Sequence, residues 1–311
     1  MKTIPIVFAF DNNLILPACV CISSLLMNAK EDTFYDIFIL HSSKVNLHKE
    51  QLDELPRHFS RCRIQYRVVD NTFDQAFEIR GITAATYYRL LIPELIPEYD
   101  KVIYADVDII FRMDLSELYN TEIGENYIAA TRELGMNLTK DGKKHIHSMP
   151  GLTIGSYIQA GFIVMNIQAI LKDNIHLRFK EWSNKKLKFQ DQDILNIVCK
   201  DKIHYLPMEY NMTDYSYMFA VRKRSLIKDL FSDTEIDYAV KNGNIHYNGH
   251  KPWKKYSVNF DIWWEYYRKS PFFDEEFYFE FFYTRLNELD QLSLWKRIKI
   301  LIRYFVFGRR K

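Results

Sequence analysis

The chain has 311 residues, of which 48% are hydrophobic and only 10 are Gly and 9 are Pro. This composition is typical of a globular protein and excludes a disordered or collagen-like one. The net charge is +2, but residues 296–311 contain seven Lys or Arg and no acid, and removing these seven leaves −5 on the remainder. A charge confined to one end argues against a general nucleic-acid binder.

The cysteines and the N-terminus indicate the cellular setting. No CxxC pair and no zinc-spaced cluster occurs, so we expect free thiols in a reducing compartment, at Cys19, Cys21, Cys62 and Cys199. The opening MKTIPIVFAFD superficially resembles a secretion signal, but its apolar run covers only residues 4–10 and has no small-residue cleavage site. No run of 18 apolar residues occurs, so no membrane-spanning segment is expected.

Strands and helices alternate through the first third of the chain. Near-continuous apolar runs predict strands at residues 4–10, 34–42, 61–70 and 101–111. Helical spacing predicts helices between them, at residues 16–28 and 47–59. In the stretch 83–96 a helix is predicted up to Pro93. Strands that alternate with helices predict an α/β domain with a mostly parallel central sheet.

The pattern loosens after residue 120. Strands are expected at residues 123–131 and 157–167, helices at 177–184 and 191–199, and strand-and-loop segments at 203–212 and 244–253. Residues 133–156 are polar, basic and irregular, which predicts a long loop of functional importance.

The composition changes again beyond residue 256, where aromatic residues are dense. At 100° per residue, five apolar side chains near the end of the chain fall within about 120° of one another: Trp295, Ile298, Leu301, Ile302 and Phe305. Lys296, Lys299 and Arg303 point elsewhere. This pattern predicts a basic amphipathic helix that lies in a membrane interface. The alternative is a terminal helix docked on its own domain with a charged outer face.

The stretch KVIYADVDIIF places Asp106 and Asp108 in an apolar strand. In an extended strand these two side chains share a face, about 7 Å apart, and like charges there resist burial unless a cation compensates them. At the carboxyl end of a parallel strand they would stand where α/β sheets bind ligands. Carboxylate oxygens suit Mg²⁺ or Mn²⁺, which often bridge to substrate phosphates. The alternative is a pair of carboxylates that emerge into solvent.

Three further motifs carry polar groups that could bind a ligand. Asp11 and Asn13 follow the first strand and could read a base or ribose, while the absence of GxGxxG argues against a dehydrogenase-type dinucleotide fold. FQDQDILN places Asp191 and Gln192 at the expected start of a helix, where an N-terminal cap is the alternative reading. The stretch NIHYNGHKPW offers a potential metal ligand, a tight turn and a phosphate-neutralising ammonium, in His246, Gly249 and Lys251.

Five stretches together resemble the family 8 retaining glycosyltransferases, which include bacterial lipopolysaccharide glucosyl- and galactosyltransferases and the glycogenins. They are IVFAFDNN, TYYRLLIPELIPEYDKVIYADVDII, YIQAGFIVMNI, FQDQDILN and HYNGHKPW. The resemblance implies a single GT-A-like, Rossmann-like nucleotide-sugar domain over residues 1–255. It also implies a C-terminal helical region over residues 256–311, with a tail similar to membrane-attaching tails of the bacterial branch. Mn²⁺ (Mg²⁺ is possible) and a UDP-hexose would be bound.

The resemblance also assigns roles to individual residues. The implied metal ligands are Asp106, Asp108 and His246. Uridine and ribose would lie against Ala9, Asp11 and Asn13, and the diphosphate against Gly249 and Lys251. The donor sugar would be surrounded by Arg89, Asp191, Gln192 and the backbone around Ala160. Asp106 and Gln159 would also take part in binding the donor. Two departures stand out: Gln159 occurs where the family usually has Asn, and the loop between Gly249 and Lys251 is one residue shorter than in several relatives.

The function implied is transfer of a hexose, glucose or galactose, from a UDP-sugar to a glycan hydroxyl such as that of lipopolysaccharide core. The resemblance places the catalytic groups at Arg89, Asp191 and Gln192. Double displacement would need a protein nucleophile, for which Asp191 or Gln192 is the nearest candidate, and because Gln is a poor nucleophile front-face return is favoured. The basic tail favours a lipid-linked acceptor at the cytoplasmic face of the cell membrane over self-glucosylation on one of 21 tyrosines. Two alternatives remain: a metal-dependent nucleotidyltransferase, and a catalytically degenerate glycan-binding relative.

Overall fold

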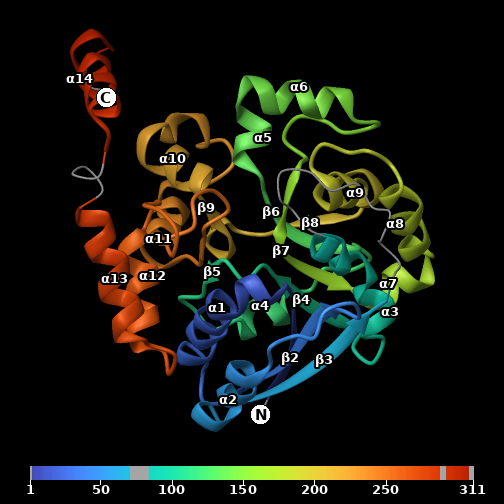
Figure 1. Ribbon diagram of the computed structural model, residues 1–311. Helices are drawn as coiled ribbons and strands as arrows, with labels where there is room; N and C mark the ends of the chain where they lie inside the picture. The colour runs from blue at the N-terminus through green and yellow to red at the C-terminus, as the bar shows by residue number, and fades with distance from the viewer. Residues whose placement is uncertain (1, 71–83, 288–291, 308–311) are drawn as a thin grey trace. The chain divides into compact units, whose positions relative to one another are not determined.

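The computed structural model describes residues 2–70, 84–287 and 292–307 (Figure 1). It divides into two compact units, Met1–Phe272 and Phe273–Lys311. The ends of two predicted segments, residue 83 and residues 308–311, lie outside the described residues.

The first unit is built on a seven-stranded sheet in the order β3-β2-β1-β4-β7-β6-β8. Its strands are β1 (Lys2–Ala9), β2 (Thr33–Ser42), β3 (Cys62–Val69), β4 (Lys101–Ala105), β6 (Ile128–Arg132), β7 (Ile158–Asn166) and β8 (Ile203–Tyr205). All neighbouring pairs are parallel except those of β7, which runs antiparallel to β4 and β6. The predicted α/β fold with a mostly parallel sheet is confirmed.

Helices cover both faces of this sheet. On one face α1 (Ile15–Met27) and α2 (Glu50–His58) pack against alternate β1 residues such as Ile6 and Phe8. On the other face Val7 contacts a core formed with 3₁₀ helix η3 (Ala84–Leu91) and with α3 (Ile92–Leu95), α7 (Ile167–Lys172), α8 (Ile175–Ser183) and α9 (Gln190–Cys199). Burial on both faces is why these strands are apolar throughout rather than alternating.

A second, three-stranded sheet has the order β5-β10-β9, from β5 (Ile109–Ile110), β10 (Ile245–His246) and β9 (Met212–Thr213). The remaining short elements of the first unit are η1 (Asn12–Leu14), α4 (Ser116–Asn120), α5 (Leu134–Leu138), α6 (Lys140–Ser148), η4 (Met208–Tyr210), α10 (Asp214–Arg222), η5 (Arg224–Leu226), α11 (Asp233–Asn242) and α12 (Phe260–Lys269).

Three predicted elements differ from the structure. Residues 101–111 are not one strand, because β4 ends at Ala105, residues 106–108 form a turn, and β5 joins the other sheet. The expected loop at 133–156 contains α5 and α6, whose first turns are capped by Glu133 and Thr139. The predicted helix does not stop at Pro93, which instead lies in the first turn of α3, where its missing N–H costs nothing.

The second unit contains α13 (Glu275–Leu286) and α14 (Leu294–Phe307). Helix α14 confirms the helix expected near the end of the chain. No helix among the described residues combines the length and apolarity needed to cross a bilayer.

Candidate active site

A cleft of about 1150 Å³ opens where several strands of the large sheet end. Twelve of the thirteen predicted site residues line it: Ala9, Asp11, Asn13, Arg89, Asp106, Asp108, Gln159, Ala160, Asp191, Gln192, His246 and Lys251. Gly249 is not among the described lining residues, and it packs so tightly that a Cβ there would lie 2.2 Å from Asp214 Oδ2. Residues from six separate stretches of chain thus meet at one edge of the sheet, as ligand sites in α/β folds do.

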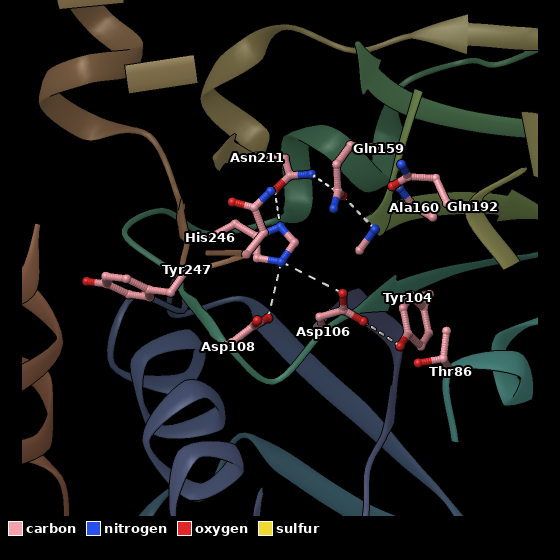
Figure 2. A network of polar contacts seen from close by, with 12 residues as sticks. Thr86, Tyr104, Asp106, Asp108, Gln159, Ala160, Gln192, Asn211, His246 and Tyr247 are labelled. Carbon is pink, nitrogen blue, oxygen red and sulfur yellow. Dashed lines mark hydrogen bonds and ion pairs between the residues drawn. The ribbon is translucent and has the colours of Figure 1, made fainter. Parts of the chain in front are cut away.

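The centre of the cleft holds a cluster of three potential metal ligands. Asp106 and Asp108 come from the turn after β4, and His246 comes from β10 (Figure 2). One ligand atom from each lies within 4.8 Å of the others. His246 Nε2 is 3.2 Å from Asp108 Oδ1 and 3.7 Å from Asp106 Oδ2. Neighbouring ligands of an octahedral ion with bonds of about 2.1 Å lie about 3 Å apart, so this spacing fits a divalent cation.

Asp106 has its two oxygens in different surroundings. Oδ1 accepts hydrogen bonds from Arg89 (2.9 Å) and from the Tyr104 hydroxyl (2.7 Å), whereas Oδ2 faces His246. A Cβ at Gly161 would lie 2.4 Å from both Asp106 Oδ2 and His246 Cε1, so only glycine leaves this space open. The carboxylate is therefore fixed at one oxygen and free to bind a cation with the other.

Asp108 is held in its charged form. Burial alone would raise the pKa of this carboxyl, but Lys251 and His246 outweigh burial and hold the pKa well below its usual range. Lys251 Nζ contacts Asp108 Oδ2 and also donates to the Tyr247 carbonyl at 2.6 Å. Asp108 Oδ1 is buried and makes no hydrogen bond of good geometry among the described residues, although His246 Nε2 lies 3.2 Å away. A buried carboxylate oxygen left without a hydrogen bond, beside a second carboxylate and an imidazole, is the donor set expected for Mn²⁺ or Mg²⁺.

Arg89 joins the metal cluster to the start of α9. Its side chain is buried, donates to the Ala160 carbonyl at 2.6 Å, and lies 3.0 Å from Asp191 Oδ2. Burial raises the pKa of Asp191 to about 7, although Arg89 opposes this effect. The Gln192 carboxamide oxygen accepts from the Ala160 N–H at 3.1 Å. Asp191 and Gln192 are not the N-terminal cap of α9, since the N-cap is Phe189 and no side chain caps the helix. Both residues instead contact groups that line the cleft.

Sequence reasoning missed Glu133, which lines the cleft, and Asn211, which contacts the cleft residue His246. Glu133 lines the cleft, contacts the Gly135 N–H at 3.0 Å, and has a pKa that burial raises to about 7. Asn211 contacts His246 Nδ1 at 2.9 Å. Neither residue stands in an apolar strand or a recognisable motif, and their contacts come from distant parts of the chain.

Comparison with known proteins identifies the fold and the family. The family model of glycosyl transferase family 8 matches residues 5–257. A putative glycosyltransferase of Haemophilus influenzae is 30% identical over 68% of this chain and 64% of its own length. The lipopolysaccharide 1,3-galactosyltransferase of Salmonella typhimurium is 26% identical over 81% of this chain and 74% of its own length. A crystal structure of the galactosyltransferase LgtC with donor and acceptor sugar analogs has the same fold, with a TM-score of 0.70 at 24% identity over 88% of this chain and 98% of that one. The match covers the ends of β1 and β4, the paired aspartates and His246 of the cleft. This chain therefore belongs to glycosyl transferase family 8 and is a glycosyltransferase.

Proposed function

We propose that the protein transfers a hexose, glucose or galactose, from a UDP-sugar to a hydroxyl of a cell-envelope glycan, with retention of anomeric configuration. The observation that carries this proposal is the cluster of Asp106, Asp108 and His246, with Lys251 beside it, in the main cleft of a family 8 chain. Paired carboxylates and a lysine at a strand end are suited to a metal-bound diphosphate.

The metal proposed is Mn²⁺, with Mg²⁺ as the other candidate, held by Asp106, Asp108 and His246. When bound, it would neutralise charge on the two phosphates of the donor and on departing UDP. Lys251 supplies a second positive charge at the same place, because its Nζ lies against Asp108 and the residue lines the cleft.

The nucleotide is proposed to lie at the end of β1. Ala9, Asp11 and Asn13 all line the cleft there, and the Asp11 carboxylate accepts the Asn13 N–H at 2.9 Å, which fixes the turn. Gly249 and Lys251 are proposed for the diphosphate. A side chain at position 249 would meet the Asp214 carboxylate, so glycine leaves room beside it.

The donor sugar is proposed to lie near Arg89, Asp191 and Gln192, with Gln159 and the Ala160 backbone beside them. Double displacement would need a nucleophile at the anomeric carbon. The Gln192 oxygen is engaged by the Ala160 N–H, and the Asp191 carboxylate is paired with the buried Arg89 guanidinium, so neither is a strong nucleophile. We therefore favour front-face return, in which the acceptor attacks from the side that UDP leaves.

The acceptor is proposed to enter past α5 and α6, since Gly135, Met136, Thr139 and Asp141 line that part of the cleft. In the second unit, α14 exposes large apolar groups, with Trp295 80% and Phe305 77% exposed, beside an exposed set of cations. This is the surface expected of a helix that binds an anionic membrane. We accordingly assign donor and acceptor chemistry to residues 1–255 and attachment to the inner face of the cell membrane to residues 256–311.

A thermal-shift panel tests the donor class. UDP-glucose, UDP-galactose, UDP-N-acetylglucosamine, GDP-mannose and ATP would each be added with Mn²⁺ or with EDTA. A ligand at 100 times its dissociation constant stabilises the folded state by about 2.7 kcal/mol, or several degrees of melting temperature. We expect a shift with a UDP-hexose that EDTA removes. A shift with ATP alone would instead favour the nucleotidyltransferase, and no shift at all would favour a degenerate glycan-binding relative.

A further inference from the structure

The two ring nitrogens of His246 face different partners. Nε2 faces the two aspartates, whereas Nδ1 lies 2.9 Å from Asn211 Oδ1 (Figure 2). Both side chains are almost fully buried, with His246 2% and Asn211 1% exposed. The polar groups that face the two ring nitrogens therefore favour one position of the hydrogen over the other.

A chain of hydrogen bonds leads from this pair to the backbone of β7. Asn211 Nδ2 donates to Gln159 Oε1 at 2.9 Å, and the Gly161 N–H donates to the same oxygen at 2.5 Å. A backbone N–H is only ever a donor. Gln159 must therefore turn its oxygen toward Gly161, so Asn211 must turn its NH₂ group toward Gln159.

This fixes the other end of the Asn211 carboxamide. Its oxygen must face His246, so Nδ1 must carry a hydrogen. The neutral ring then has its lone pair on Nε2, directed at the space between Asp106 and Asp108. Without such a constraint the two carboxylates, at 3.2 and 3.7 Å, would favour the opposite tautomer, with a hydrogen on Nε2. That hydrogen would occupy the position that a metal ion needs.

We propose that Asn211 and Gln159 are positioning residues that transmit the fixed polarity of the Gly161 N–H to His246 and hold it in the Nδ1–H tautomer. The inference rests on the metal site of the proposed function and deepens it. Partners of this kind for a ligating histidine change metal affinity typically 10- to 100-fold when they are lost. In this arrangement the Gln159 oxygen accepts hydrogen bonds from Gly161 and Asn211, the residues that lead to the metal ligand His246.

The test uses the full-length protein and three variants. Asn211→Leu removes the acceptor for Nδ1–H, while Asn211→Asp keeps an acceptor oxygen at the same place. Asn244→Leu is the matched control, because Asn244 is also fully buried beside β10 but bonds to the Arg112 N–H (2.9 Å) and the Tyr210 carbonyl instead. Circular dichroism verifies that each variant is folded.

Two readouts are combined. Long-range ¹⁵N–¹H NMR on metal-free protein, at a pH where the ring is neutral and with His246→Gln used for assignment, reports the tautomer. Electron paramagnetic resonance of unbound Mn²⁺ reports metal affinity without turnover. We expect the Nδ1–H tautomer in wild type, Asn211→Asp and Asn244→Leu. In Asn211→Leu we expect its loss together with Mn²⁺ binding that is about 10- to 100-fold weaker.

The outcomes separate the two levels of the proposal. A wild-type protein that binds Mn²⁺ but carries the hydrogen on Nε2 refutes the relay and leaves the metal site intact. Unchanged tautomer and affinity in folded Asn211→Leu, or an equal loss in Asn244→Leu, also refutes it. If Asn211→Leu does not fold, Gln159→Leu replaces it with the same expectation in reduced degree, and full wild-type affinity in that variant overturns the relay. Wild-type protein that binds no Mn²⁺ refutes the metal site itself, and the inference with it.

Discussion

Glu133 should make the protein less stable as the pH rises, and Glu133→Gln should remove this dependence. The Glu133 side chain is 6% exposed and contacts one backbone N–H, that of Gly135, at 3.0 Å. Burial raises its pKa from the ordinary 4.5 to about 7. The folded state thus favours the protonated acid, whereas the unfolded chain ionises it near pH 4.5.

The ionisation of Glu133 makes the free energy of unfolding depend on pH, because the folded and unfolded states bind its proton with different pKa values. Between about pH 4.5 and 7 the unfolded state releases the Glu133 proton and the folded state keeps it, so the contribution to folding stability falls as pH rises. Raising this pKa from 4.5 to about 7 favours the protonated carboxyl in the folded state by about 3.4 kcal/mol at most. Integrated between about pH 5 and pH 8, the difference in free energy of unfolding between Glu133→Gln and wild type should increase by about 2.5 kcal/mol.

Urea denaturation at the two pH values, with EDTA present, measures this difference. Glu125→Gln is the control, since its side chain is 79% exposed and the substitution should change the unfolding free energy by less than about 0.5 kcal/mol at either pH. If the Glu133→Gln difference is the same at both pH values, the carboxyl ionises normally in the folded protein. The surroundings of the Glu133 carboxyl would then be far more polar than the burial of this side chain indicates.

Three other perturbations probe the metal cluster and the tail. Gly161→Ala should weaken Mn²⁺ binding at least tenfold, because the added Cβ meets Asp106 Oδ2 and His246 Cε1 at 2.4 Å; unchanged affinity by calorimetry would contradict this geometry. Asp108→Ala should abolish Mn²⁺-dependent sugar transfer with the circular dichroism spectrum preserved, and near-normal turnover would remove Asp108 from the proposed ligand set. Deleting residues 292–311 should leave activity on a soluble acceptor but abolish sedimentation with anionic vesicles; equal sedimentation of the truncated protein would exclude the tail as the membrane anchor.

The large sheet was predictable because its strands are buried on both faces. Such strands are apolar at consecutive positions, as in β1 and β2, and the helices between them show helical spacing. The 133–156 segment was not predictable in the same way. Its two helices are short and contain glycine, α6 is also polar, and both depend on caps from Glu133 and Thr139 that resemble ordinary loop residues.

Part of the site was predictable because a polar residue follows an apolar strand. Asp11 after β1 and Asp106 after β4 follow this rule, and β1 and β4 are neighbours in the sheet. Asn211 follows no such rule, because its partner His246 is 35 residues away and the contact forms only when β9 pairs with β10. Sequence patterns report local burial, and they do not report which polar groups long-range pairing brings together.

The place where β4 ends shows how the two sheets together build the metal cluster. The Asp106 N–H donates to the Gly161 carbonyl at 2.7 Å, which is the last contact of this segment with β7. The Tyr247 N–H then donates to the Asp108 carbonyl at 2.9 Å, and His246 pairs with Ile109 in the antiparallel register of β10 and β5. The large sheet thus fixes the first aspartate and the small sheet fixes the second together with the histidine. A slip of one residue between β10 and β5 would turn the imidazole to the opposite face of the small sheet. The spacing of the three ligands therefore depends on the register of two short strands. Asp106 and Asp108 lie between β4 and β5, and this position lets both sheets hold them.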